Sequence, residues 1–290
     1  MTTNTLMQAV VDQLVDQMEA GAGDWSMPWN AALVNDMPNN ATTGVNYRGG
    51  NVIWLWMTQL DKEYRTAQWA TYKQWASIDA QVRKGEHGTR IFVWKPIERS
   101  DEPTTDDTPV NRHGFYSSFV VFNADQVDGY DIPVVEPLDP AALDARVSTW
   151  IEALPFTPRP GRPSYSPTLD VVYMPEAGAF HTTDGYVATL AHEAAHWTGH
   201  TSRLARTFGK RFGDDTYAAE ELVAELSSAF TCAALQQRTT PRLDHAQYLS
   251  HWCQMLRADP SILFSVASKA QQATDFLLAY ADAHYLEESA

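Results

Sequence analysis

One segment of this chain constrains its fold and chemistry more than any other: TLAHEAAHWTGHTS, residues 189–202. It holds two histidines separated by three residues, with a glutamate directly after the first. On an α-helix, His192 and His196 lie one turn apart and their imidazoles point the same way. Two such imidazoles with Glu193 beside them as general base are typical of zinc hydrolases. The segment therefore predicts a helical Zn²⁺ site, and the alternative is a helix with two exposed histidines.

Residues that commonly begin and end helices flank this segment. Thr182, Thr183 or Asp184 can act as the N-cap, and the helix is expected to run to about Trp197. Gly199 stands where a left-handed residue often follows a helix. The predicted helix is thus bounded at both ends.

A site of this kind needs a third protein ligand. One class of zinc proteases places a third histidine six residues after the second, but that position is Ser202 here, which excludes the class. The segment DDTYAAEELVAELSSAF, residues 214–230, offers carboxylates instead. Glu221 and Glu225 fall one turn apart on a predicted second helix. We assign Glu221 to the metal and Glu225 to a hydrogen bond that orients a ligand histidine.

The neighbours of these glutamates argue against a solvated acidic face, because Leu222 and Leu226 stand among them and buried carboxylates need partners. Glu220 falls on a different face of the predicted helix and is left outside the site. Tyr217 and His200 are candidates for the donor that stabilises an oxyanion. His200 is also the alternative third ligand.

Two histidines and one glutamate leave a position on the ion for water. Glu193 would take a proton from the attacking water and pass it to the leaving amine. The strand-like segment DVVYMP, residues 170–175, could pair with an extended peptide. The pattern predicts a zinc-dependent metallopeptidase with a protein substrate. The alternative is a non-catalytic DNA-binding protein with a structural zinc site.

The first 130 residues have a different character. Residues 39–97 carry 8 basic side chains against 4 acidic ones, although the whole chain has a formal charge of −15. Seven of the ten tryptophans lie in the same half: Trp25, Trp29, Trp54, Trp56, Trp69, Trp75 and Trp94. Aromatic rings that stack on bases, interleaved with cations that contact phosphates, are typical of single-stranded DNA binding. The candidate DNA-binding residues are Asn40, Thr43, Tyr47, Arg48, Asn51, Lys73, Arg83 and Lys84. Trp54 and Trp94 stand in apolar runs and are expected in the core.

Prolines and acidic residues concentrate in DIPVVEPLDPAALD, residues 131–144, which is interpreted as a linker. We therefore expect an N-terminal mixed α/β DNA-binding domain over residues 1–130. A mostly helical domain with the metal site would follow over residues 145–290. The fold class predicted for both halves is α+β.

Local patterns predict three elements of the N-terminal half. TAQWATYKQWASIDA, residues 66–80, is interpreted as a helix. RIFVWKP, residues 90–96, and FYSSFVVFNADQV, residues 115–127, are predicted as paired strands. The acidic segment between them, residues 98–114, would form a long hairpin loop.

The composition also favours a cytoplasmic protein. The N-terminus lacks the basic start and apolar stretch of a secretion signal, and no apolar run approaches the ~18 residues that span a bilayer. An amphipathic helix is expected there instead, packed on its own domain through Met7, Val10, Val11, Leu14 and Met18. Two cysteines are ordinary for a reducing cytosol.

Several segments together resemble a known family. PWNAALVNDMPNNATTGVNYRGGNVIWLW, WATYKQWASIDAQVRKGEHGT and FVVFNADQVDGY resemble the N-terminal domain of ArdC-type antirestriction proteins. YSPTLDVVYMP, LAHEAAHWTGH, RFGDDTYAAEELVAEL and SVASKAQQATDFL resemble that family's C-terminal zincin-like domain. The match covers nearly the full length in the same order.

The resemblance implies a plasmid- or phage-borne protein that binds single-stranded DNA and helps incoming DNA escape host restriction. It implies a metallopeptidase-like fold related to the DNA–protein crosslink proteases, with a restriction-system component as a candidate substrate. By position, His192, Glu193, His196 and Glu221 match the family's metal site. The loop of residues 40–51 matches the most recognisable segment of its DNA-binding domain.

Overall fold

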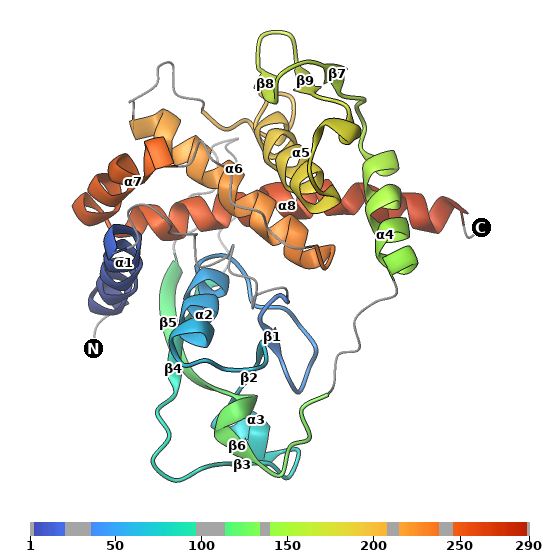
Figure 1. Ribbon diagram of the computed structural model, residues 1–290. Coiled ribbons are helices and arrows are strands. Elements are labelled where there is room, and N and C mark those ends of the chain that lie inside the picture. The colour runs from blue at the N-terminus through green and yellow to red at the C-terminus, as the bar shows by residue number, and fades with distance from the viewer. Residues whose placement is uncertain are drawn as a thin grey trace, which may run out of the picture.

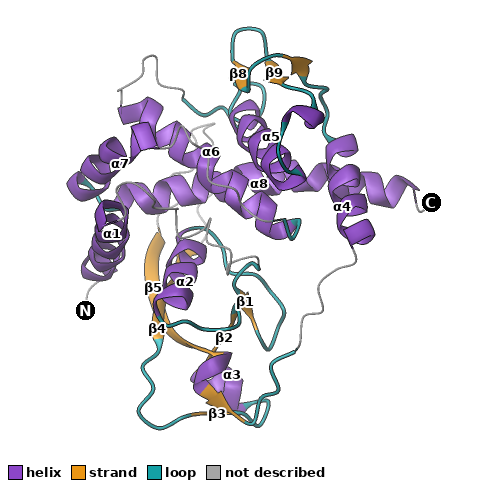
Figure 2. Cartoon of the chain, viewed as in Figure 1, coloured by secondary structure: helices purple, strands orange, loops and turns teal. Residues whose placement is uncertain are grey.

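The computed structural model describes residues 3–20, 36–96, 114–133, 140–207, 215–237 and 246–288. Its architecture has two domains, an N-terminal part of mixed helices and strands and a mostly helical C-terminal part (Figures 1 and 2). This confirms the predicted α+β class. Helix α4 (Pro140–Ala153) begins inside the segment interpreted as a linker, so the last residues of that segment are helical.

The N-terminal part is built on a four-stranded sheet in the order β1-β2-β5-β4. Its strands are β1 (Asn39–Asn40), β2 (Gln68–Thr71), β4 (Thr89–Pro96) and β5 (Gly114–Asn123). β1 and β2 are parallel, and the other neighbours are antiparallel. The pairing of β4 with β5 confirms the predicted strand pair, and the loop between them lies outside the described residues.

The helix predicted over residues 66–80 is wrong in its first half. Residues there form β2, because Trp69 and Ala70 are fully buried in a strand that pairs with both β1 and β5. Only α3 (Tyr72–Ala76) is helical. Thr71 and Gln74 start it with a capping box, in which each side chain binds the other residue's backbone N–H. Helix α2 (Gly50–Asp61) and the strand pair of β3 (Gln81–Val82) with β6 (Val127–Asp128) complete this part, together with a short 3-10 helix, η2 (Ala124–Gln126).

The C-terminal part is mostly helical, and its other helices lie around the long helix α8 (Ser261–Glu288). These are α4, α5 (Thr183–Thr198), α6 (Asp215–Ala234) and α7 (Ala246–Ala258), with the 3-10 helix η3 (Ala177–Ala179) before α5. Helices α5 and α6 pack against each other and both pack on α8. No helix among the described residues is long and apolar enough to cross a membrane.

A small sheet in the order β7-β9-β8 lies beside α5. Its strands are β7 (Arg159–Pro160), β8 (Ser164–Ser166) and β9 (Val171–Met174). β9 is the segment expected to pair with an extended peptide. That expectation is wrong, because β7 and β8 already occupy its two edges.

The two parts share one hydrophobic cluster. Helix α1 (Thr3–Ala20) is amphipathic as expected, but it packs mainly against α7 rather than on its own domain (Figure 1). Val10 and Leu14 of α1 are buried in a cluster that also holds Trp56 of α2 and Phe230 of α6. The Trp56 and Phe230 rings lie 5.7 Å apart. Burial of this apolar surface therefore stabilises the contact between the two parts.

Candidate metal centre and nucleic-acid surface

Helix α5 carries the His–Glu–x–x–His segment, and its ends are held by local hydrogen bonds. Thr182 is the N-cap and accepts a hydrogen bond from the Gly185 N–H at 3.1 Å. The prediction of a left-handed Gly199 is wrong, because its φ is −76°. The chain turns tightly instead, and the Gly199 N–H donates to the His196 carbonyl at 2.9 Å. The last carbonyls of α5 are thus satisfied without a left-handed residue.

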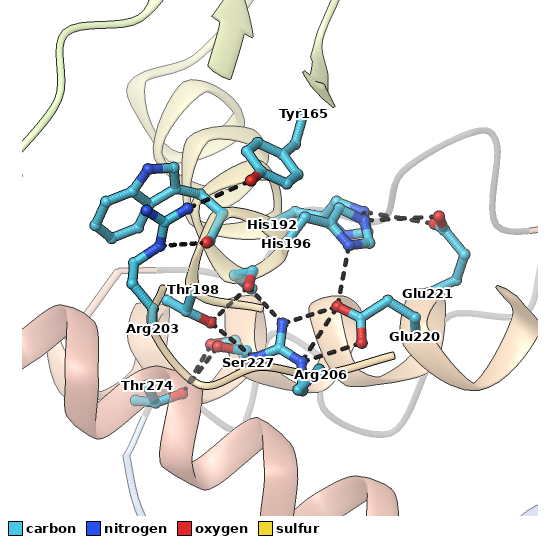
Figure 3. A network of polar contacts seen from close by, with 12 residues as sticks. Tyr165, His192, His196, Thr198, Arg203, Arg206, Glu220, Glu221, Ser227 and Thr274 are labelled. Atoms are coloured by element: carbon cyan, nitrogen blue, oxygen red, sulfur yellow. Dashed lines mark hydrogen bonds and ion pairs between the residues drawn. The ribbon is translucent and has the colours of Figure 1, made fainter. Parts of the chain in front are cut away.

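Helices α5 and α6 bring the three predicted ligands together (Figure 3). The Nε2 atoms of His192 and His196 lie 3.2 Å apart. The two carboxylate oxygens of Glu221 lie 3.6 Å from these nitrogens, one oxygen for each histidine. One ligand atom from each residue falls within 4.8 Å of the others. Two nitrogens bound to one tetrahedral ion at ~2.1 Å lie ~3.4 Å apart, so the donor set and spacing fit a divalent metal ion.

Each histidine also faces a carboxylate on its other ring nitrogen. Glu225 Oε2 lies 3.7 Å from His192 Nδ1, on the side we expected for an orienting group. The placement of Glu220 outside the site is wrong, because its Oε1 lies 3.4 Å from His196 Nδ1 (Figure 3). Carboxylates in these positions fix the tautomer and the orientation of a ligand imidazole.

Arg206 holds Glu220 in place, and sequence patterns did not identify it. Its Nη2 and Nε donate to the two Glu220 oxygens at 2.7 and 3.0 Å. The same guanidinium donates to the Ala195 carbonyl at 2.6 Å and to Thr198 Oγ1 at 2.8 Å (Figure 3). Both charged side chains are only 6% exposed. Arg206 therefore neutralises a buried carboxylate and ties the chain after α5 to the last turn of that helix.

The carboxylates around the cluster favour positive charge within it, either as a proton on His196 or as a bound cation. Burial raises the pKa of Glu221, but the His192 hydrogen bond, the charges of both histidines and a Tyr217 hydrogen bond outweigh it and bring the pKa to about 2. Burial lowers the pKa of His196, but the Glu220 hydrogen bond and neighbouring carboxylate charges outweigh it and raise the pKa. The Glu221 carboxylate thus remains ionised at neutral pH.

The remaining predicted site residues divide into two groups. Glu193 is buried, and its charge contributes to the raised pKa of His196, so it lies within the site. Tyr217 hydrogen-bonds the carboxylate of Glu221, a candidate ligand. His200 instead lies with its Nδ1 2.8 Å from Ser202 Oγ and is not part of the ligand group. Of the two oxyanion candidates, Tyr217 is therefore the one next to the ligands.

A second arginine, Arg203, links the end of α5 to the small sheet. Arg203 stacks 3.8 Å from the centroid of the Trp197 ring and donates to the Trp197 carbonyl at 2.7 Å. It also pairs with Asp170 and reaches the Tyr165 hydroxyl of β8 at 3.3 Å (Figure 3). This hydrogen-bonded pair holds the pKa of Asp170 at about 2. The β8–β9 turn is thereby fastened to the end of α5.

Several predicted DNA-binding residues turn out to shape the loop that carries them. Asn40 Oδ1 accepts hydrogen bonds from the backbone N–H groups of Thr42 and Thr43, at 3.1 and 3.2 Å. The Asn51 side chain is bonded in both directions to the Phe92 backbone, at 2.7 and 2.9 Å. The half-buried Tyr47 donates to the Trp69 carbonyl at 3.3 Å. These side chains hold the loop in its conformation, so its exposed surface is formed by the neighbouring residues.

The predicted cations lie in two separate regions. Arg48 pairs with Asp275 of α8. Lys73 on α3, with Arg83 and Lys84 in the turn after β3, lies at the end of the N-terminal part farther from α8 (Figure 1). All three are exposed, and Arg83 also donates hydrogen bonds to Glu86 and to the Asp125 carbonyl.

The tryptophans are largely unsuited to stacking on bases. Trp56, Trp69 and Trp75 are fully buried, and Trp54 is half-buried against the shared cluster. Trp25, Trp29 and the Trp94 side chain lie outside the described residues. Tyr72 and Phe119, which sequence patterns did not single out, are 48% and 40% exposed and offer aromatic faces to solvent.

A His–His–Glu cluster on two packed helices, joined to a strand-based N-terminal part, defines a class: a two-domain protein with a zincin-like metallopeptidase domain. Residues 150–269 match the family model of the zincin-like metallopeptidases. Residues 4–122 match the model of the N-terminal domain of anti-restriction factor ArdC.

Whole-chain comparisons agree with these matches. The chain is 36% identical to the metal-free structure of antirestriction ArdC protein from the R388 plasmid, with a TM-score of 0.76 over 95% of this chain and 97% of that one. A Mn(II)-bound structure of the same protein matches equally well, at 35% identity. The chain belongs to the ArdC family of antirestriction proteins.

Two further relatives come from bacteria. The uncharacterized protein y4eC of Sinorhizobium fredii is 37% identical over 95% of this chain and 92% of its own length. DNA primase TraC of Escherichia coli is 35% identical over 97% of this chain, which spans 28% of the primase. A similar unit thus also occurs within a longer protein.

Proposed function

We propose that this protein is an antirestriction factor that binds single-stranded DNA and uses a zinc peptidase site to help incoming DNA escape restriction. The observation that carries the proposal is the His192–His196–Glu221 cluster, in which one candidate ligand atom of each residue lies within 4.8 Å of the others in a zincin-like domain. The family supplies the biological setting, since R388 ArdC is described as an antirestriction protein.

His192 Nε2, His196 Nε2 and the Glu221 carboxylate would hold the ion. Two imidazoles and one carboxylate form the ligand set of catalytic zinc sites, which favours Zn²⁺. When bound, the ion supplies Lewis-acid polarisation of a carbonyl group and lowers the pKa of water. The Mn(II)-bound structure of R388 ArdC supports a divalent site in the family.

The protein's own groups provide the proton transfers and the orientation. Glu193 accepts a proton from the attacking water and returns it to the leaving amine. Glu225 and Glu220 keep the His192 and His196 rings oriented through their Nδ1 atoms. Tyr217, which hydrogen-bonds Glu221, is the candidate donor to a developing oxyanion. The substrate would be a protein, and a restriction-system component is the candidate.

We assign DNA binding to the N-terminal domain, residues 1–130, and the metal site to the C-terminal domain, residues 145–290. The loop of residues 40–51 and the exposed cations Lys73 and Lys84 support the assignment of DNA binding. We place the protein in the cytoplasm, where free, buried Cys232 and Cys253 are ordinary.

The test compares native protein with Glu193→Gln and with Glu152→Gln, the same change at an exposed residue of α4. Bound zinc, proteolysis of host restriction proteins and escape of an incoming plasmid from restriction are measured for each. Glu193→Gln should retain about one zinc per chain but lose proteolysis and protection, whereas Glu152→Gln should behave as native. Full protection by Glu193→Gln would contradict the peptidase role and favour a structural zinc in a DNA-binding protein.

A further inference from the structure

A pocket of about 560 Å³ lies where the N-terminal part meets α8. Residues 46–51 and Phe92 of β4 line one side, and residues of α8 line the other. Helix α2, which begins in this segment, packs beside α8 (Figure 1). The volume falls in the range of ~300–1,000 Å³ that small-ligand sites occupy. Both parts of the chain therefore build this pocket.

Two glycines hold the N-terminal segment against α8. Gly49 has a φ of +58°, and a Cβ on Gly50 would lie 2.5 Å from the Phe264 ring. The Gly49 N–H donates to Gln271 Oε1 at 3.2 Å, and Arg48 pairs with Asp275. The close approach depends on the absence of a side chain at Gly50, whereas Gly49 has a left-handed φ that favours glycine.

The lining of the pocket is suited to part of an anionic ligand. Arg48 is the one charged residue among those that line it, and the other polar side chains are amides and hydroxyls. Phe92 and Phe264, with ring centroids 5.2 Å apart, supply an aromatic surface. On a chain with a formal charge of −15, Arg48 supplies the positive charge that a phosphate needs in this pocket.

We propose that this pocket binds one nucleotide unit, with its base against the Gln272 amide of α8 and its phosphate on Arg48. Asparagine and glutamine amides recognise base edges through paired donor and acceptor atoms. Gln271 already binds Gly49 and Asp275, so Gln272, exposed on the pocket wall, is the amide that α8 offers. This inference rests on the proposed binding of single-stranded DNA.

Arg48 can exchange its partner at little cost. The Arg48 and Asp275 side chains are 61% and 43% exposed. Ion pairs in such exposed positions contribute little to stability. A phosphate can accept two parallel hydrogen bonds from the guanidinium, which a single-oxygen contact with Asp275 does not provide. Because DNA binding would then use residues of both parts, the experiment uses the full chain.

The test measures binding of a fluorescein-labelled single strand by anisotropy, at one fixed salt concentration, for native protein and two variants. Gln272→Glu adds a negative charge to the pocket wall and removes the amide donor. Gln254→Glu makes the same change on an exposed position of α7 that does not line the pocket. Loss of a base contact and repulsion of phosphate should weaken binding by Gln272→Glu at least about fivefold. Gln254→Glu should stay within about twofold of native, because a distant exposed charge is screened.

An unlabelled deoxynucleoside monophosphate serves as competitor and distinguishes the source of the nucleotide. If the monophosphate displaces the labelled strand from native protein, free nucleotides occupy the pocket. The absence of displacement, together with weaker strand binding by Gln272→Glu, would show a nucleotide bound within a strand. Equal strand affinities of the two variants would overturn this inference alone. If native protein binds no single strand and no monophosphate, the proposed DNA binding fails and this inference fails with it.

Discussion

Replacing Glu220 by glutamine tests whether the buried network behind His196 supports both the fold and the metal site. Both carboxylate oxygens accept hydrogen bonds from Arg206, and Oε1 lies 3.4 Å from His196 Nδ1. Glutamine has nearly the same shape but no charge, so the Arg206 guanidinium would stay buried without its counter-charge.

The expected loss of stability follows from the burial of this pair. Removing one partner of a buried ion pair costs about 3–5 kcal/mol, and we expect the lower end, because the glutamine oxygen still accepts one hydrogen bond. At about 2 °C per kcal/mol, ~3 kcal/mol lowers the melting temperature by roughly 6 °C. Metal affinity should fall about 10- to 100-fold, because His196 loses the carboxylate that orients its ring.

Two measurements check the Glu220→Gln variant. Urea unfolding of metal-free protein gives the free energy of unfolding, and titration against a competing chelator gives the zinc affinity. Glu152→Gln, at an exposed position of α4, should change the free energy of unfolding by less than about 0.5 kcal/mol. A Glu220→Gln protein with native stability and native zinc affinity would refute the assigned role of the network.

Two further substitutions probe other parts of the structure. Arg203 holds the pKa of Asp170 at about 2, so this pair stabilises the fold above pH ~4 and is lost as the pH falls toward 2. Asp170→Asn should remove this contribution to the loss of stability in acid, as measured by urea unfolding at successive pH values. The change in the free energy of unfolding should be less than about 1 kcal/mol, because the Asp170 side chain is 37% exposed. An unchanged pH profile of stability would contradict this. Gly50→Ala would place a methyl group 2.5 Å from Phe264. This should lower the free energy of unfolding, measured by calorimetry, by about 1–3 kcal/mol. Gly178→Ala, with nothing within 4 Å, is the control, and equal melting temperatures of the two alanine variants would refute the close approach.

The His192–His196–Glu221 cluster could be predicted because helical periodicity decides which side chains share a face. Histidines four residues apart on α5 must lie together, and the apolar neighbours of Glu221 indicated a buried carboxylate. How α5 and α6 pack does not follow from either helix alone. Helical periodicity therefore leaves Glu220 outside the site, and its partner Arg206, in the segment after α5, carries no recognisable pattern.

The N-terminal part was harder to predict because long-range pairing decides its local structure. Residues 68–71 follow a helical pattern, yet pairing with β1 and β5 makes them a strand. Asn51 was predicted to contact DNA from its place in a polar loop, but its amide binds the Phe92 backbone, which is 41 residues away in the sequence. The packing of α1 against α7 likewise depends on a contact between the two ends of the chain.

The most direct test is a zinc titration of metal-free protein, followed by calorimetry and by metal analysis after gel filtration. Native protein should bind about one ion per chain at the His192–His196–Glu221 cluster. Glu221→Gln, which preserves the size of the side chain, should bind zinc at least about tenfold more weakly. Stoichiometric binding of equal affinity in both proteins, or no saturable binding by native protein, would contradict the central claim that these residues form a metal site.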